Sequence, residues 1–131
     1  MPEEVDESVI RADRWSKVIA VLWAGVTFFL ASVLTGEPLF SMIVAAFAGI
    51  GVRIYVPYHA SITAPDPDQR PIQDYEGTGN YHQGAVGAGV VVAATVAVPV
   101  AAVGYGSTVA LAVGGGVGVV VFLVLRAILP S

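Results

Sequence analysis

Residues 84–103 read GAVGAGVVVAATVAVPVAAV and residues 107–125 read STVALAVGGGVGVVVFLVL, and neither run contains a charged residue. Two further apolar runs precede them. Residues 18–35 read VIAVLWAGVTFFLASVLT, and residues 39–56 read LFSMIVAAFAGIGVRIYV, in which Arg53 near the end is the one charge. A helix that crosses a membrane needs about 20 largely apolar residues. We therefore expect an all-α integral membrane protein with four transmembrane helices.

The composition supports this fold class and excludes several functions. Of the 131 residues, 56% are hydrophobic and 12% are charged, whereas about 25% of the residues in soluble domains are charged. A soluble bundle of four buried helices is the alternative, but no span has a polar face, so such a bundle would leave large apolar surfaces in water. Six basic residues against ten acidic ones do not favour nucleic-acid binding. The sequence has no cysteine, which excludes disulfides and thiolate metal sites.

The segments between the apolar runs predict how the spans are connected. Residues 36–38 and 104–106 are short enough to be tight turns, so we expect two antiparallel hairpins with both termini on the same side of the membrane. Residues 57–83 hold several prolines and many polar side chains, which predicts an irregular loop. Residues 1–14 form an acidic tail that is either frayed or folded as a short surface helix. Residues 15–131 are then the membrane domain.

The charged residues predict the orientation. All six basic residues fall on the side of the termini and of the 57–83 loop, and the positive-inside rule makes this side cytoplasmic, or luminal in a vesicle. Nine of the ten acidic residues lie on the same side, and Glu37 is the exception. The acidic start of the chain also argues against a cleaved signal peptide, which would begin with basic residues.

Aromatic and basic side chains are expected to mark the two membrane surfaces, because amphipathic side chains favour the headgroup depth. Arg53 and Arg126 are close enough to the surface on the side of the termini to reach it. The rings expected at that surface are Trp15, Tyr55, Tyr58 and Tyr81, and those expected at the opposite surface are Phe40 and Tyr105.

Small residues recur at every fourth position on the last two spans. They are Ala85, Gly89, Ala93, Ala97 and Ala101 on the third span, and Gly106, Ala110, Gly114 and Gly118 on the fourth. Small side chains allow helix backbones to approach closely in lipid. The pattern therefore predicts a helix-packing surface, whose partner is either the neighbouring span or a second copy of the chain. Shorter versions of the pattern, 20–24 and 45–49, lie on the first two spans.

No motif in the sequence predicts catalysis. His59 and His82 lie at the two ends of the polar segment without a third ligand at suitable spacing, so we predict no metal or haem site. No ionisable residue lies in the middle of a span, which argues against ion transport by this chain alone. Pro99 is expected to bend the third span, and residues 114–116 to soften the fourth. We predict no catalytic residue and no cofactor, and the lipid bilayer as the main partner, with the chain itself or other membrane proteins as further partners.

Five arginines against one lysine, together with acidic exposed segments, resemble the proteins of haloarchaea; a general acidic membrane protein is the competing explanation. Within that source, the plan of four spans, acidic inner segments and very short outer turns resembles the small internal membrane protein of the haloarchaeal pleomorphic viruses, the pleolipoviruses. The resemblance is architectural and compositional, and it transfers no functional residue. It implies a non-enzymatic structural protein that faces the virion lumen and resides in the host cell membrane before budding. An accessory or anchor subunit of an archaeal membrane complex and a holin-like pore former are the alternatives.

Overall fold

The computed structural model describes residues 7–63 and 82–129, and all regular structure within them is helical. The elements in chain order are α1 (Glu7–Thr35), α2 (Pro38–Thr63), α3 (Gln83–Val100), the π-helical turn η2 (Ala101–Tyr105) and α4 (Ser107–Ile128). Counting α3 and η2 together, four helices are long and apolar enough to cross a membrane. The predicted all-α fold with four membrane-length helices is therefore confirmed.

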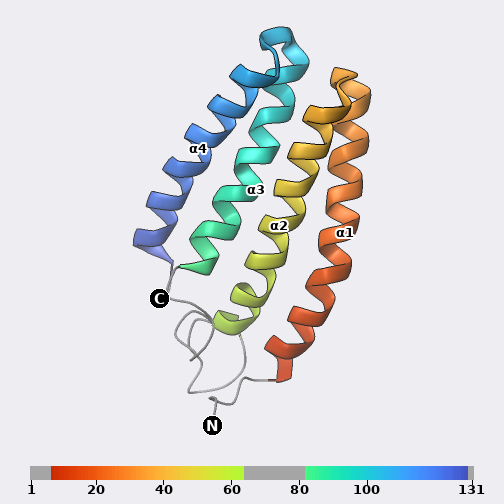
Figure 1. Ribbon diagram of the computed structural model, residues 1–131. Helices are drawn as coiled ribbons and strands as arrows, with labels where there is room; N and C mark the ends of the chain where they lie inside the picture. The colour runs from red at the N-terminus through yellow and green to blue at the C-terminus, as the bar shows by residue number, and fades with distance from the viewer. Residues whose placement is uncertain (1–6, 64–81, 130–131) are drawn as a thin grey trace.

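The four helices lie side by side in a single layer. Figure 1 shows them in the order α1, α2, α3, α4, with each helix antiparallel to the next, and the contacts between helices are mainly those between neighbours along the chain. The start of α1 and the end of α4 lie at the same end of the layer, which we call the terminal end. The opposite end, which carries the two short connections, is the turn end.

Two predicted boundaries were wrong. The helix α1 begins at Glu7, so residues 7–14 continue the helix that contains the first span and form neither a frayed tail nor a separate helix. The helix α2 continues through Pro57 to Thr63, although a loop was expected from residue 57 onward. A proline inside a membrane helix is tolerated where packing and neighbouring polar groups compensate for its missing N–H. Most of the expected loop, residues 64–81 with Tyr81 at its end, lies outside the described residues, as do residues 1–6 and 130–131.

The turn end is built from residues that favour sharp reversals. Gly36 has a φ of +66° between α1 and α2, a conformation that side chains with a Cβ rarely adopt. The Thr35 hydroxyl donates to the Ala31 carbonyl at 2.6 Å and accepts from the Glu37 N–H at 3.2 Å. Pro38 then occupies the first turn of α2, where its missing N–H has no helical partner to lose. The first connection is therefore tight because each of its residues fits the local geometry.

A small apolar core joins all four helices near the turn end. Phe40 and Val44 of α2 are almost completely buried, and alanines of the three other helices surround them. The core consists of Ala31, Phe40, Val44, Ala48, Ala94, Ala97 and Ala110. The ring of Phe40 fills the space that these small alanine side chains leave. The expectation that Phe40 lies at the depth of the membrane surface stays a prediction.

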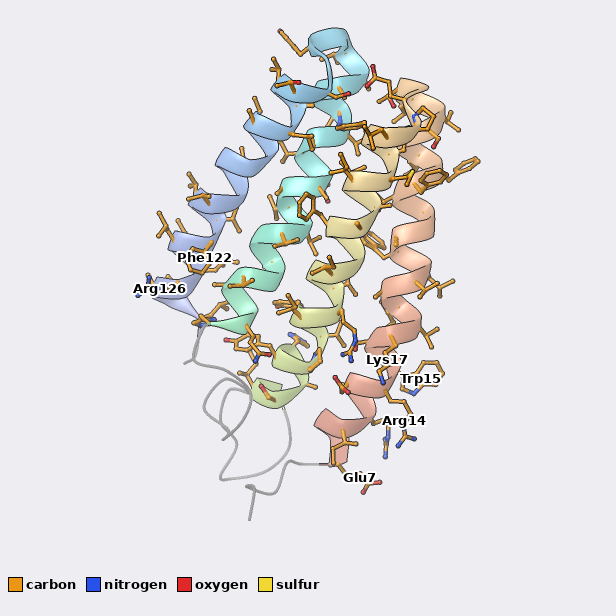
Figure 2. All side chains as sticks on the ribbon, in the orientation of Figure 1. Glu7, Arg14, Trp15, Lys17, Phe122 and Arg126 are labelled. Carbon is orange, nitrogen blue, oxygen red and sulfur yellow. The ribbon has the colours of Figure 1, made fainter. Side chains whose placement is uncertain are left out.

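Outside this core, the layer exposes apolar side chains along its length. Val21, Leu39 and Val103 are each 71% exposed, and both Trp15 and Trp23 are substantially exposed. Charged side chains such as Glu7 and Arg14, by contrast, gather at the terminal end (Figure 2). Water would not stabilise an apolar surface of this extent, so the structure supports an integral membrane protein whose exposed faces contact lipid.

Candidate functional site

The backbones of α3 and α4 approach most closely where glycines from both helices face each other. A Cβ atom added to Gly118 would lie 2.7 Å from the carbonyl oxygen of Gly89 and 2.9 Å from the Cβ of Ala93. A Cβ added to Gly89 would lie 2.9 Å from the carbonyl oxygen of Gly118. Gly114 packs in the same way against the Ala93 carbonyl oxygen, and its Cβ would lie 3.1 Å from the Cβ of Ala97. These positions of the predicted surface therefore face the neighbouring helix of the same chain.

The remaining residues of that predicted surface are placed in different ways. Ala85 and Ala110 are completely buried, and Ala101 of η2 packs against the apolar core at the turn end. Gly106 does not pack: it is exposed, its φ is +87°, and no atom would contact an added Cβ. The four-residue spacing does not place Gly106 on the packing surface, because regular helix stops at Gly104, whose φ is +99°, and resumes at Ser107. Gly106 instead forms part of the turn before α4.

A second close helix contact, between α2 and α3, was not predicted. A Cβ on Gly51 would lie 2.8 Å from the Gly87 carbonyl oxygen, and a Cβ on Gly87 would lie 2.9 Å from the Gly51 carbonyl oxygen. Gly84 extends this contact, because it lies directly beneath the ring of Tyr58. The signal was present in the sequence: α3 carries small residues at 84 and 87 as well as at 85 and 89, so two faces of the same helix can pack closely.

The contact between α1 and α2 is looser but follows the same principle. A Cβ on Gly49 would lie 3.3 Å from both the Ala20 carbonyl oxygen and the Ala24 Cβ. These residues belong to the two shorter small-residue patterns predicted on the first two spans. Each helix therefore meets its neighbour along the layer through glycine or alanine.

An ion pair joins α1 and α2 at the terminal end. The guanidinium of Arg53 donates from Nη1 to Asp13 Oδ1 at 2.6 Å and to the Ser16 hydroxyl at 2.9 Å. Ser16 is completely buried and donates in turn to the Asp13 carbonyl at 2.6 Å. The positive charge of Arg53 is thus paired with the carboxylate of Asp13 on the neighbouring helix. Asp13 is part of that helix because α1 begins at Glu7. The sequence analysis placed Arg53 at the surface and did not identify this partner.

Tyr58 and His82 close the terminal end of the α2–α3 contact. Tyr58 is completely buried between helices, and the expectation that it lies at the depth of the membrane surface stays a prediction. The centroid of its ring is 5.3 Å from that of His82. His82 caps α3, because its Nδ1 accepts from the Ala85 N–H at 3.2 Å. With Nδ1 as the acceptor, Nε2 carries the proton and faces the Leu129 carbonyl oxygen at 3.4 Å.

The two histidines do not share a site. His59 lies on α2, where its ring centroid is 5.8 Å from that of Tyr55, whereas His82 contacts Tyr58 and the start of α3. Among residues 7–63 and 82–129, no three side chains of His, Asp or Glu are close enough to hold a metal ion. His82 contributes to the packing between α2 and α3, whereas His59 is exposed and contacts Tyr55 of its own helix.

At the turn end, Glu37 joins the two hairpins. Its carboxylate accepts a hydrogen bond from the hydroxyl of Ser107, the first residue of α4. Its carbonyl accepts from the Ser41 hydroxyl at 2.8 Å. A carboxylate at this place also faces the positive end of the α4 helix dipole, which is stabilising. The one acidic residue predicted outside the terminal end therefore has a structural role.

Comparison of the chain with known protein families, with curated proteins and with solved structures gave no match. The described residues bring together three glycine- and alanine-lined helix contacts, one ion pair between helices, one histidine cap and one carboxylate link between the two turns. The cap completes the start of α3, and the other interactions hold helices to one another. The candidate functional surfaces are therefore the exposed faces of the layer itself.

Proposed function

We propose that this chain is a non-enzymatic structural protein of a lipid envelope, specifically an internal membrane component of a haloarchaeal virus that faces the virion lumen. The observation that carries the proposal is the open layer of four membrane-length helices with apolar side chains exposed on its surface. Such a layer exposes a large apolar surface to lipid although the chain is short. Its polar interactions serve packing between helices, as a scaffold requires.

The distribution of charge supports the proposed location. Ten acidic residues against six basic ones, with five arginines and a single lysine, fit a chain whose exposed segments are solvated in concentrated salt, where repulsion between like charges is screened. The charged residues that the structure describes gather at the terminal end, apart from Glu37. In the proposed topology this end faces the cytoplasm of the host and then the interior of the virion.

The proposal is tested by locating the protein. Lipid-containing particles from the source culture are floated on a density gradient, and the chain is quantified by mass spectrometry in the particles and in the cell membranes. We expect the chain to be abundant in the floated particles and to resist added protease until detergent opens them. Recovery only in cell membranes, at fixed stoichiometry with a larger complex, would instead establish an anchor subunit. Lysis of cells on expression would establish a holin-like pore former.

A further inference from the structure

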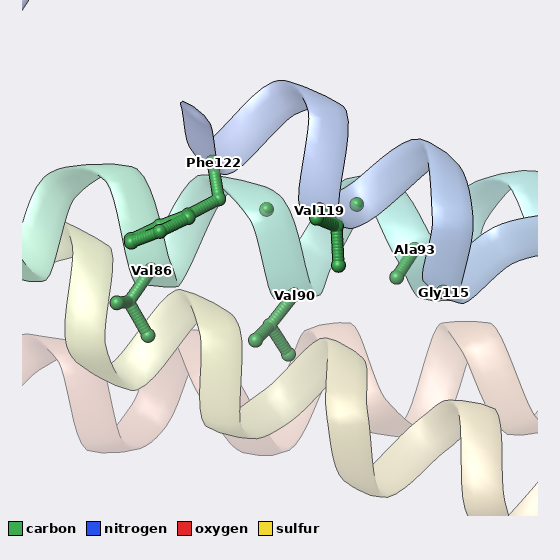
Figure 3. Close-up of a pocket in the computed structure, with 8 residues that line it drawn as sticks. Val86, Val90, Ala93, Gly115, Val119 and Phe122 are labelled. Atoms are coloured by element: carbon green, nitrogen blue, oxygen red, sulfur yellow. The ribbon is translucent and has the colours of Figure 1, made fainter. Parts of the chain in front are cut away.

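An apolar groove runs along the surface of the layer between α3 and α4. It has a volume of about 350 Å³, which falls in the range of small-ligand pockets, roughly 300–1,000 Å³. Figure 3 shows Val86 and Phe122 at one end, Val90 and Val119 in the middle, and Ala93 and Gly115 at the other end. All of these side chains are apolar, so the groove suits a hydrocarbon group.

The groove follows from the close packing of the two helices. Because the backbones meet at Gly89 and Gly118, the small residues Ala93 and Gly115 beside them leave a depression between the larger side chains. A Cβ added to Gly115 would have no atom within 4 Å. The depression is thus open toward the membrane and is not filled by the protein itself.

On α4 the groove extends from Gly115 to Phe122, which is about 10 Å of helix at 1.5 Å per residue. Arg126 lies four residues beyond Phe122, so about 16 Å of helix separates Gly115 from Arg126. Half of a hydrocarbon core about 30 Å thick is about 15 Å. The groove together with the helical turn that follows it therefore matches the depth of one leaflet at the terminal end.

Arg126 lies one helical turn beyond the end of the groove. It follows Phe122 by four residues on α4, at the terminal end of the layer (Figure 2). The Arg126 side chain is exposed, and the two ion pairs found among the described residues involve other arginines, Arg11 and Arg53. A cation thus stands at the mouth of an apolar groove at headgroup depth.

We propose that this groove and Arg126 bind one anionic membrane lipid, with a hydrocarbon chain in the groove and the headgroup phosphate on the guanidinium. Arginine recognises phosphate through two parallel hydrogen bonds, and the apolar lining requires no polar partner from the ligand. A helix of a second copy would extend well beyond the end of the groove at Ala93 and Gly115. The inference goes beyond a structural role, and it does not depend on whether the membrane is viral.

Two neighbouring glycines allow a matched test of the groove. Gly115→Leu places a side chain in the groove, while Gly116→Leu, one position further, places the same side chain outside it; neither added Cβ would contact an atom within 4 Å. Val119→Phe and Val120→Phe form a second pair, because Val119 lines the groove and the two valines are 58% and 59% exposed. The second pair keeps the test valid if a leucine at 115 prevents folding.

The headgroup contact is tested by Arg126→Gln, with Arg14→Gln as the control, because Arg14 is an exposed arginine at the same end of the layer on α1. Each variant is reconstituted in phosphatidylcholine vesicles with a trace of chain-spin-labelled phosphatidylglycerol or phosphatidylcholine. Electron paramagnetic resonance then gives the fraction of each lipid immobilised by the protein. We expect the original protein to prefer phosphatidylglycerol about fivefold, as one cation near an anionic headgroup provides about 1 kcal/mol.

The proposal requires Arg126→Gln to remove this preference while Arg14→Gln retains it, and Gly115→Leu to reduce the immobilised fraction while Gly116→Leu does not. Equal immobilisation in both groove pairs would show that the groove is not the lipid site. An unchanged preference in Arg126→Gln would refute the headgroup contact. If Gly115→Leu leaves lipid immobilisation intact but abolishes a crosslinked dimer, a second copy occupies the groove and the lipid proposal fails.

Discussion

Replacing Gly118 with alanine should push α3 and α4 apart. The added Cβ would lie 2.7 Å from the Gly89 carbonyl oxygen, where an ordinary contact begins at 3.4 Å, so the two helices must separate by about 0.7 Å (3.4 minus 2.7). The carbonyl belongs to a helix backbone and cannot rotate away as a side chain would. Overpacking of this kind typically costs about 1–3 kcal/mol, and we expect the free energy of unfolding of Gly118→Ala to lie below that of a matched control by that amount.

Gly116→Ala is the matched control for this prediction. It makes the same chemical change on the same helix, but its Cβ would contact nothing within 4 Å. Alanine favours a helix over glycine by about 1 kcal/mol, and this gain is common to both variants. The difference between the two variants therefore isolates the packing contribution at Gly118.

The assay is unfolding in mixed micelles with increasing mole fraction of dodecyl sulfate, followed by circular dichroism. The variant Gly118→Ala should unfold at a lower mole fraction than Gly116→Ala, and crosslinking should show whether either variant changes its association state. Indistinguishable midpoints for the two variants would refute the conclusion that the α3–α4 contact requires glycine at 118.

Three further outcomes are expected. A double-mutant cycle with Asp13→Asn and Arg53→Gln should give a coupling free energy of unfolding of about 1 kcal/mol or less, since the two side chains are 49% and 38% exposed. A coupling free energy near 3 kcal/mol would contradict this degree of solvation. The sequence has no cysteine, so an impermeant maleimide added to intact cells should label Glu37→Cys but not Arg14→Cys, and the reverse pattern would invert the predicted topology. Detergent-purified protein should remain monodisperse in molar salt and aggregate in dilute buffer, because excess acidic charge repels itself when unscreened; a size-exclusion profile independent of salt would contradict this expectation.

The four helices were predictable because lipid leaves the backbone few alternatives. Each apolar run must satisfy its own N–H and C=O groups, and a helix does so within one segment. The end of α2 was not predictable from composition. Pro57 and the polar residues after it suggest a loop, but the buried ring of Tyr58 packs over Gly84, and this contact holds the additional helical turns. Residues so far apart in the sequence are brought together only by the fold.

The helix contacts were predictable in part for a similar reason. Small residues at a regular spacing identified Gly89 and Gly118 on the surface between α3 and α4, since one periodic pattern describes one face. The contact between Gly51 and Gly87 was missed because it lies on a second face of α3. Small residues occur on both faces of this helix, so a single four-residue pattern does not reveal the second one. The partner of Arg53 was missed because Asp13 lies 40 positions away, on a segment interpreted as a tail.

The order of the helices in the layer has a consequence for biosynthesis. Each helix after the first packs on the one synthesised just before it, so a newly inserted span finds a neighbour already present in the membrane. Chains emerge from the ribosome at roughly 5–20 residues per second and fold from the N-terminal side. The protein can thus assemble during translation, one span at a time, because each new helix can pack on the preceding one as soon as it is inserted. The hydrogen bond between Glu37 and Ser107 forms only when the fourth span arrives, and it completes the assembly by fastening the second hairpin to the first.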